Sequence, residues 1–342
     1  MKAIILERFG EPLVAGEVPT PTIGPGEVLV RVQANGLCAT DLKMMDGLVP
    51  TVPLPHILGH EVAGEVVEVG AEVRDLQPSD HVTVYMHLGC GFCDYCRAGL
   101  ENLCQHAPRT GFELDGGFSE YMRVLGRNAV KIAREVPLEE AAILPDAVAT
   151  CYHALVQKAR VRVGETVVVI GVGGLGIHAV QVARIMGARV IAADVVPEKL
   201  RAAQKFGAEV VVNSREEDLP QRVKALTGGL GADVVAECVG GHTVPDVLRE
   251  SIACLKLGGR LVVMGYMYGQ PLSVDSADLI YGQWSILGTR ASSLQDLVEV
   301  VRLVESGQLK PVVSERFPLE QANEALAVLR ENPPLGRIVL TS

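Results

Sequence analysis

A glycine-rich turn between an apolar strand and a helix constrains the fold of this chain most. Thr166–Ile170 is rich in β-branched residues, which favour strands, and the motif GVGGLG (residues 171–176) follows at once. The three spaced glycines allow a tight turn, approach of the backbone to a pyrophosphate, and close helix packing. The helix N-terminus that follows favours negative charge. The motif therefore predicts a dinucleotide site formed by Gly171, Gly173, Gly174, Leu175 and Gly176.

Strands and helices alternate from about Val163 to Gly288, the part of the chain that contains this turn. The expected strands are Thr166–Ile170, Val190–Asp194, Val210–Val212, Asp233–Glu237, Arg260–Met264 and Ser285–Gly288. The expected helices are Leu175–Met186, Pro197–Phe206, Leu219–Leu226 and Val244–Cys254. This alternation predicts an α/β fold with a parallel, doubly wound sheet. Six strands are the number needed for the two mononucleotide-binding halves of a Rossmann sheet.

Asp194 ends the second expected strand of this sheet. An acidic residue there hydrogen-bonds the ribose 2′-hydroxyl of NAD and repels the 2′-phosphate of NADP. Val195 and Val196 follow it rather than an arginine. We therefore expect NAD as the cofactor. The alternative is that Asp194 only caps the end of its strand.

The rest of the chain predicts a second, discontinuous domain. Proline and glycine break its first part into short strands typical of a small barrel-like sheet: Val28–Ala34, Glu61–Val69 and His81–Tyr85. After Gly288 we expect the elements Leu294–Ser306 (helix), Val312–Val313 (strand), Glu320–Leu329 (helix) and Arg337–Leu340 (strand). These cannot extend a six-stranded sheet without breaking its order. The expected domains are a catalytic domain formed by residues 1–148 and 289–342 and an NAD-binding domain formed by residues 149–288.

Four of the eight cysteines crowd into one segment with the spacing C-x2-C-x2-C-x7-C: Cys90, Cys93, Cys96 and Cys104. Two-residue gaps let neighbouring thiolates turn toward one centre. Four thiolates form a closed tetrahedral zinc site that is structural, because no position stays open for substrate. An iron–sulfur cluster can use similar spacing, and free surface thiols are the remaining alternative.

Composition argues against several kinds of partner. The formal net charge is −10, whereas a surface that binds nucleic acid or anionic membrane needs clustered Lys and Arg. The N-terminal MKAIILERFG is too short for the apolar core of a signal peptide. The apolar stretch Val167–Ala183 contains several glycines and polar residues, which favours a buried strand–turn–helix over a membrane span. We expect a soluble cytoplasmic protein with a small-molecule substrate.

Three segments of the chain together resemble the zinc-containing medium-chain alcohol dehydrogenase family, within the medium-chain dehydrogenase/reductase superfamily. They are GEVLVRVQANGLCATDLK, LPHILGHEVAGEVVEVG and IGVGGLGIHAVQVAR, with the four cysteines between the second and the third. The resemblance runs in order through essentially the whole chain. It implies that the first domain is a mostly antiparallel, GroES-like β domain that carries the zinc lobe.

The resemblance also implies a second, catalytic zinc. Cys38 and His60 match two of its ligands, and Glu61 matches a carboxylate that can approach or replace a ligand. Many relatives have a cysteine as the third ligand, whereas here the matching position is Asp146, six residues before Tyr152. Some bacterial secondary-alcohol dehydrogenases have Asp there. The alternative is that Asp146 caps the following helix.

Four further residues take roles in this family comparison. Thr40 matches the position whose hydroxyl accepts the alcohol proton. Lys43 stands where many relatives carry a relay histidine, and a plain surface lysine is an equally good interpretation. Arg337 matches an arginine that reaches the cofactor pyrophosphate, and Lys199 is counted with the cofactor-binding residues.

The expected activity is interconversion of alcohols with aldehydes or ketones, with NAD and two zinc ions per subunit. A polyol or amino-alcohol dehydrogenase of the sorbitol or threonine type is the alternative on the same scaffold. A zinc-free quinone or enoyl reductase would lack Cys38, His60 and the four cysteines. A non-catalytic NAD sensor would not need the full set of ligands. By resemblance, we expect a homodimer or homotetramer joined through the strand at Ser285–Gly288.

Overall fold

The computed structural model describes residues 1–241 and 243–342. The chain divides into two compact units, one formed by Met1–Ala149 and Ala291–Ser342 and the other by Thr150–Arg290. The first unit is therefore discontinuous in sequence. Its two boundaries lie one and two residues after those expected from the sequence, at 148/149 and 288/289.

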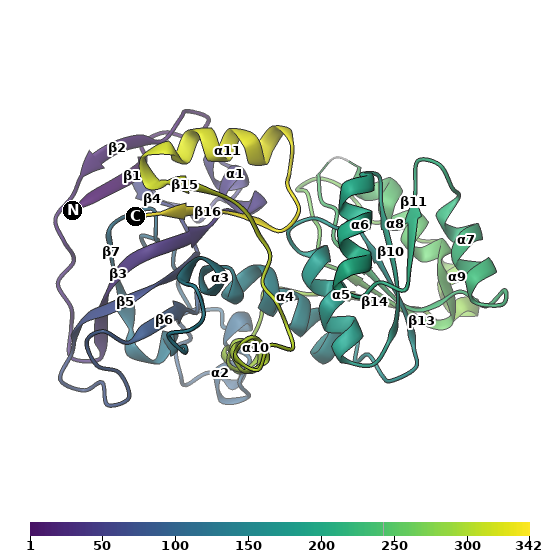
Figure 1. Cartoon of the computed structure of the whole chain (residues 1–342), viewed down its shortest axis with the longest axis horizontal. Coiled ribbons are helices and arrows are strands. Elements are labelled where there is room, and N and C mark those ends of the chain that lie inside the picture. The colour runs from purple at the N-terminus through teal and green to yellow at the C-terminus, as the bar shows by residue number, and fades with distance from the viewer. Residues whose placement is uncertain (242) are drawn as a thin grey trace. The chain divides into compact units, whose positions relative to one another are not determined.

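The second unit contains a parallel six-stranded sheet with the strand order β11-β10-β9-β12-β13-β14 (Figure 1). Its strands are β9 (Thr166–Ile170), β10 (Arg189–Asp194), β11 (Val210–Asn213), β12 (Ala232–Glu237), β13 (Leu255–Val263) and β14 (Ser285–Gly288). Its helices are α5 (Gly176–Ile185), α6 (Pro197–Phe206), α7 (Leu219–Leu226), α8 (Val244–Ala253) and α9 (Ser276–Gly282). Numbered from β9, this is the order 3-2-1-4-5-6 of the dinucleotide fold, whose ligands bind where the order reverses, between β9 and β12.

Two sheets make up the first unit, and both are mostly antiparallel. One has the order β15-β16-β3-β5-β6-β8 with β7 paired to β3, and the other has the order β2-β1-β4. The strands are β1 (Lys2–Leu6), β2 (Val14–Glu17), β3 (Glu27–Gly36), β4 (His56–Ile57), β5 (Glu61–Val69), β6 (His81–Val84), β7 (Tyr121–Leu125), β8 (Ala129–Lys131), β15 (Val313–Pro318) and β16 (Arg337–Thr341). Buried valines of β3, β5 and β6 form part of a hydrophobic core along the larger sheet.

Helices and irregular turns connect these strands. The helices of the first unit are α1 (Ala39–Met45), α2 (Asp94–Arg97), α3 (Leu138–Ala142), α10 (Leu294–Glu305) and α11 (Ala322–Glu331). The helix α4 (Ala149–Tyr152) crosses the boundary, and π-helical segments flank it at Leu144–Val148 and His153–Lys158. The predicted fold class is confirmed: a parallel Rossmann sheet and a mostly antiparallel β domain occur in one chain.

Several element bounds differ from those expected. β13 begins at Leu255 rather than Arg260, because Ala232 already pairs with Leu255 before a register shift between Ala232 and Val234 of β12. β15 runs to Pro318 because it pairs with β16 over its length.

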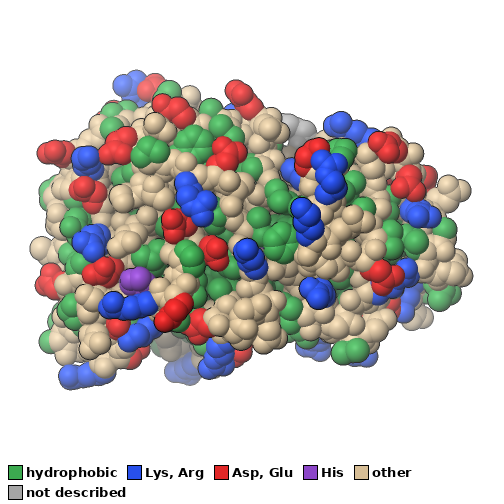
Figure 2. All heavy atoms as spheres, in the orientation of Figure 1, with side chains coloured by type: hydrophobic (Ala, Val, Ile, Leu, Met, Phe, Trp, Pro, Cys, Tyr) green, Lys and Arg blue, Asp and Glu red, His purple; other side chains and the backbone are tan. Residues whose placement is uncertain are grey.

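On the face drawn in Figure 2, acidic and basic side chains are interspersed. Within the part of the chain that the structure describes, no helix has the length and apolar character needed to cross a membrane.

Candidate active site

Three neighbouring strands bring the candidate ligands of the first unit to one place. Glu61 begins β5 directly opposite Gly36 at the end of β3. Cys38 lies two residues beyond Gly36, at the N-cap of α1. β16 runs antiparallel to β3 with Val339 opposite Gly36, so Arg337 lies beside Cys38. Residues that are up to 300 positions apart in sequence therefore meet because of sheet register.

Asp146 reaches the same place from the π-helical segment Leu144–Val148. Asp146 lies inside this segment and not at its N-terminus. It therefore does not act as a helix N-cap, which was the alternative interpretation of this residue. One ligand atom from each of Cys38, His60, Glu61 and Asp146 lies within 4.8 Å of the others. His60 Nε2 and Asp146 Oδ2 are 3.8 Å apart. The residues chosen by resemblance thus form one cluster, in which Cys38, His60 and Glu61 are buried and Asp146 is partly buried.

Asp41 is a site residue that the sequence reasoning missed. Its carboxylate is fully buried and lies with Oδ1 3.2 Å from His60 Nδ1. Its Oδ2 accepts a hydrogen bond from the backbone N–H of Cys38 at 2.8 Å. Asp41 occupies the third position of α1, where a carboxylate bonds back to the N-cap residue. That spacing in Cys-Ala-Thr-Asp was the signal that could have identified it.

Arg337 lies inside the cluster rather than at its edge. Its Nε donates to Glu61 Oε1 at 2.9 Å, and its Nη2 donates to Asp146 Oδ2 at 3.1 Å. Nη2 also lies 3.6 Å from the Cys38 sulfur. The guanidinium is therefore the cation that offsets two buried carboxylates. Its expected contact with the cofactor pyrophosphate stays a prediction.

The charged groups of the cluster shift one another's pKa values. Burial, together with the Asp146 charge and despite Arg337, raises the pKa of Glu61 to about 8. Burial also opposes ionisation of Asp146, yet His60 and Arg337 hold the pKa of its carboxyl well below the usual range. The Asp146 carboxyl is therefore ionised within this cluster.

The donor set fits zinc. Sulfur, imidazole nitrogen and carboxylate oxygen are the ligands that zinc takes in proteins. Glu61 Oε2 is buried and has no hydrogen-bond partner among the described residues. A Cβ at Gly36 would lie 2.0 Å from that oxygen, so the glycine makes room for the Glu61 side chain. The cluster therefore has three convergent ligands, Cys38, His60 and Asp146. A carboxylate oxygen of Glu61 could serve as a fourth.

Thr40 and Lys43 lie on α1 next to this cluster. The Thr40 N–H lies 3.5 Å from the Cys38 sulfur. Partial burial lowers the pKa of the Lys43 ammonium, and the charges of Cys38 and Asp146 oppose that shift. Lys43 is thus within electrostatic reach of the cluster, while its part in proton transfer stays a prediction.

The four cysteines of the zinc lobe also converge. Cys90 and Cys96 have their sulfurs 3.9 Å apart, and those of Cys93 and Cys104 are 3.8 Å apart. A tetrahedron with zinc–sulfur bonds of about 2.3 Å has edges of about 3.8 Å. Burial opposes ionisation, but backbone N–H groups of Phe92 and Cys93 lower the pKa of Cys90 to about 6. The geometry fits the expected tetrahedral metal.

The second unit places the glycine-rich turn at the carboxyl end of β9. Gly171 has φ of +86°, and a Cβ at Gly176 would lie 1.8 Å from the Gly171 carbonyl oxygen. A Cβ at Gly173 would meet no atom of the described chain within 4 Å. The first and third glycines are thus required by the turn and its packing, and the second leaves room for a ligand.

Asp194 faces this turn. Its Oδ2 accepts a hydrogen bond from Val172 N–H at 2.6 Å, and its Oδ1 accepts from the N–H groups of Val195 and Val196. A carboxylate has about four acceptor positions, so these three bonds leave capacity for a hydroxyl group. Lys199 lies in the first turn of α6, beyond the same strand.

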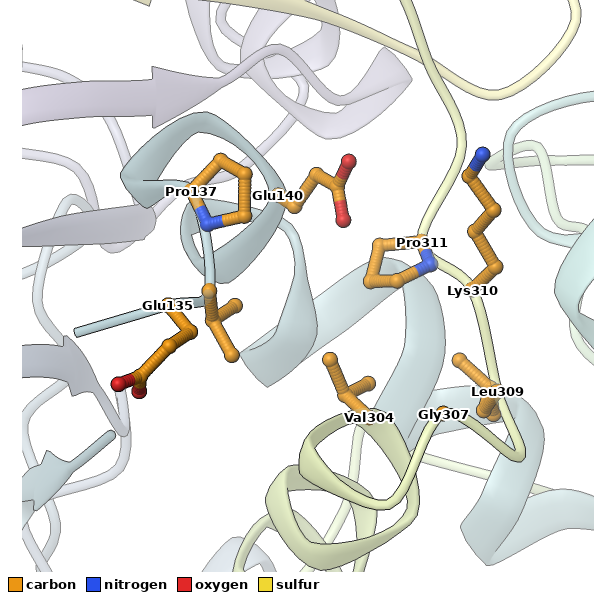
Figure 3. A pocket seen from close by; sticks show the side chains of 9 residues that line it. Glu135, Pro137, Glu140, Val304, Gly307, Leu309, Lys310 and Pro311 are labelled. Atoms are coloured by element: carbon orange, nitrogen blue, oxygen red, sulfur yellow. The ribbon is translucent and has the colours of Figure 1, made fainter. Parts of the chain in front are cut away.

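One pocket lies elsewhere in the first unit, between α3 and the end of α10 (Figure 3). Its volume is about 280 Å³. Its charged lining residues are Glu135, Glu140 and Lys310, and the carboxylate of Glu135 is turned away from Glu140 (Figure 3). None of the candidate ligands lines it.

Known proteins resemble the chain over its whole length. Residues 24–134 match the family described as alcohol dehydrogenase GroES-like domain, and residues 174–306 match the family described as zinc-binding dehydrogenase. An alcohol dehydrogenase of Geobacillus stearothermophilus is 36% identical, with 99% of each chain covered. An acryloyl-coenzyme A reductase of Metallosphaera sedula is 32% identical, with 100% of each covered. A solved NAD-dependent alcohol dehydrogenase is 36% identical, with a TM-score of 0.92 and 100% of each chain covered.

The chain therefore belongs to the zinc-containing medium-chain dehydrogenase family. The prediction of family and enzyme class from the sequence resemblance is confirmed.

Proposed function

We propose that this enzyme interconverts alcohols and the matching aldehydes or ketones, with NAD as hydride carrier and zinc held by Cys38, His60 and Asp146. The observation that carries the proposal is the convergence of one sulfur, one nitrogen and one carboxylate oxygen within 4.8 Å in a buried cluster. When bound, zinc would act as a Lewis acid toward the substrate oxygen, and NAD would accept the hydride.

The chain's own residues prepare the site for this chemistry. Asp41 fixes the tautomer of His60, because a carboxylate at Nδ1 keeps the proton there and leaves Nε2 for a metal. Arg337 balances the charge of Glu61 and leaves one buried oxygen of that carboxylate available. Thr40 is proposed, by resemblance, as the group that accepts the alcohol proton, and Lys43 as the group that relays it to solvent.

We further propose two zinc ions per chain, the second held by the four cysteines. Zinc is preferred over an iron–sulfur cluster at that lobe because the four sulfur atoms all lie within 4.8 Å of one another, as they would around a single tetrahedral ion. Asp194 supports NAD over NADP, since its carboxylate would oppose a 2′-phosphate. A homodimer or homotetramer in the cytoplasm remains part of the proposal.

A panel of primary and secondary alcohols, polyols and amino alcohols with NAD or NADP tests the function. NADH formation that a chelator removes and zinc restores is the expected result. Preference for polyols or for threonine-like substrates would identify a polyol or amino-alcohol dehydrogenase that uses the same chemistry. Firm NAD binding with no turnover on any member of the panel would overturn the proposal in favour of a sensor.

A second candidate function is the reduction of a carbon–carbon double bond conjugated to a thioester. The observation that favours it is the full-length similarity to an acryloyl-coenzyme A reductase. Consumption of NADH or NADPH with acryloyl-coenzyme A distinguishes it from alcohol oxidation. Turnover of the thioester in the absence of any alcohol activity would favour this candidate.

A further inference from the structure

The 109–114 turn places two side chains, Arg109 and Phe112, in a row with His60. The aromatic ring of Phe112 lies with its centroid 5.1 Å from that of His60, at an interplanar angle of 51°. The Arg109 guanidinium lies over the Phe112 ring, 4.0 Å from its centroid. His60 and Phe112 are 2% and 6% exposed. The order is thus guanidinium, aromatic ring, imidazole, and the last two lie in the protein interior.

Arg109 is itself held at several points. Its Nη2 donates to Glu113 Oε1 at 2.6 Å, and its Nε donates to Glu113 Oε2 at 3.1 Å. Nη2 also donates to Thr51 Oγ1 at 3.1 Å. Two parallel bonds to one carboxylate fix the plane of a guanidinium. The cation over Phe112 therefore has little freedom to leave the ring.

The backbone of the turn is pressed against the segment that carries His60. Arg109 O accepts hydrogen bonds from the N–H groups of Phe112, Glu113 and Leu114. A Cβ at Gly111 would lie 2.5 Å from the Gly59 carbonyl oxygen. The position of the Phe112 ring relative to His60 is thus set by the backbone as well as by Arg109.

From this geometry we propose that Arg109 and Phe112 are positioning residues that set the tilt of the His60 imidazole. The close approach of Nδ1 to Asp41 Oδ1, at 3.2 Å, restrains one ring atom but still allows the ring to rock about that contact. Contact with the Phe112 ring removes that freedom, and the Arg109 cation holds the Phe112 ring in place through its π face. The imidazole then presents Nε2 in one direction. This inference rests on the proposed role of His60 as a zinc ligand.

The test compares metal release from Phe112→Leu and Phe112→Tyr with that from the wild type. Zinc release into excess chelator should have one phase for each proposed site, and cobalt replacement gives an absorption spectrum that reports ligand geometry. We expect Phe112→Leu to release catalytic-site zinc about ten times faster, in line with groups that orient metal ligands, and to change the cobalt spectrum. Phe112→Tyr keeps the ring and should restore both.

Arg109→Gln provides a second variant if Phe112→Leu does not fold, because Arg109 lies on the outer side of the stack. It should also speed zinc release, whereas Arg123→Gln on the exposed face of β7 should not. Folded Phe112→Leu or Arg109→Gln protein with wild-type zinc release and cobalt spectrum would overturn the inference. Wild-type protein that binds no zinc or cobalt at His60 would instead overturn the proposed function.

Discussion

Asp41 Oδ1 lies 3.2 Å from His60 Nδ1, in the interior of the first unit. The same carboxylate accepts a hydrogen bond from the backbone N–H of Cys38 through its other oxygen. One side chain therefore orients two residues of the candidate zinc site that are 22 positions apart in sequence. Such outer partners fix the tautomer and the orientation of a histidine that binds a metal.

Asp41→Asn should weaken zinc binding at the catalytic site about 10- to 100-fold, because the amide no longer supports the charge and tautomer of His60. Competition with a chelator of known affinity measures this. Asp46→Asn, at the end of the same helix, removes only an exposed pair with Arg330 and serves as the control. Equal zinc affinity of Asp41→Asn and wild type would show that Asp41 has no such role.

Asp194→Asn should reduce the preference for NAD over NADP. The amide keeps an oxygen for the backbone bonds at Val195 and Val196 but loses the charge that opposes a 2′-phosphate. A charge-assisted hydrogen bond contributes about 1.5–3 kcal/mol, so the ratio of kcat/KM values should fall about 10- to 100-fold. An unchanged ratio would leave Asp194 as a residue that only supports the turn.

Arg337→Met should destabilise the zinc-free protein strongly, because it removes the cation that pairs with the Asp146 carboxylate and the buried hydrogen bond to Glu61. Removing one member of a buried ion pair costs about 3–5 kcal/mol. Urea unfolding of Arg337→Met measures the loss, and Arg330→Met, which breaks an exposed pair, should cost about 1 kcal/mol or less. Similar losses in the two variants would contradict this account of the cluster.

Glu113 provides a prediction for pH. Although burial opposes ionisation, the bonds from Arg109 lower the pKa of its carboxyl from 4.5 to about 2. A carboxyl whose pKa is lower in the folded state stabilises the fold fully above its unfolded pKa. That contribution should therefore disappear as the pH falls from about 4.5 to 2.

Unfolding of Glu113→Gln by urea at several pH values checks this. The difference in unfolding free energy from wild type should be constant above about pH 5 and should shrink below it. Glu299→Gln, in an exposed pair with Arg302, is the matched control. A difference that stays the same down to pH 3 would mean that Arg109 does not hold Glu113 ionised.

Much of the fold could be predicted from the sequence, because local signals and burial agreed. The β-branched run at Thr166–Ile170, the glycines after it and the following helix specify one supersecondary unit, and the structure has β9 at the expected residues. The weaker prediction concerned β13, whose early residues pair across a register shift that no local pattern shows.

Less of the candidate site than of the fold could be predicted from the sequence. Cys38, His60, Glu61 and Asp146 were chosen by resemblance, and the structure brings their ligand atoms together. Arg337 joins them through the pairing of β16 with β3, which depends on tertiary register rather than on neighbouring residues. The functional roles of these residues stay predictions.

Zinc content and turnover, measured on one sample, test most directly whether this chain is a zinc-dependent dehydrogenase with two distinct metal sites. Purified protein should hold two zinc ions per chain and reduce NAD with an alcohol. Brief treatment with 1,10-phenanthroline should remove the zinc at Cys38, His60 and Asp146 first, because three protein ligands would leave one zinc position open to the chelator. NADH formation should fall in proportion and return with added zinc. Full turnover after that zinc is lost would contradict the proposed role of the cluster.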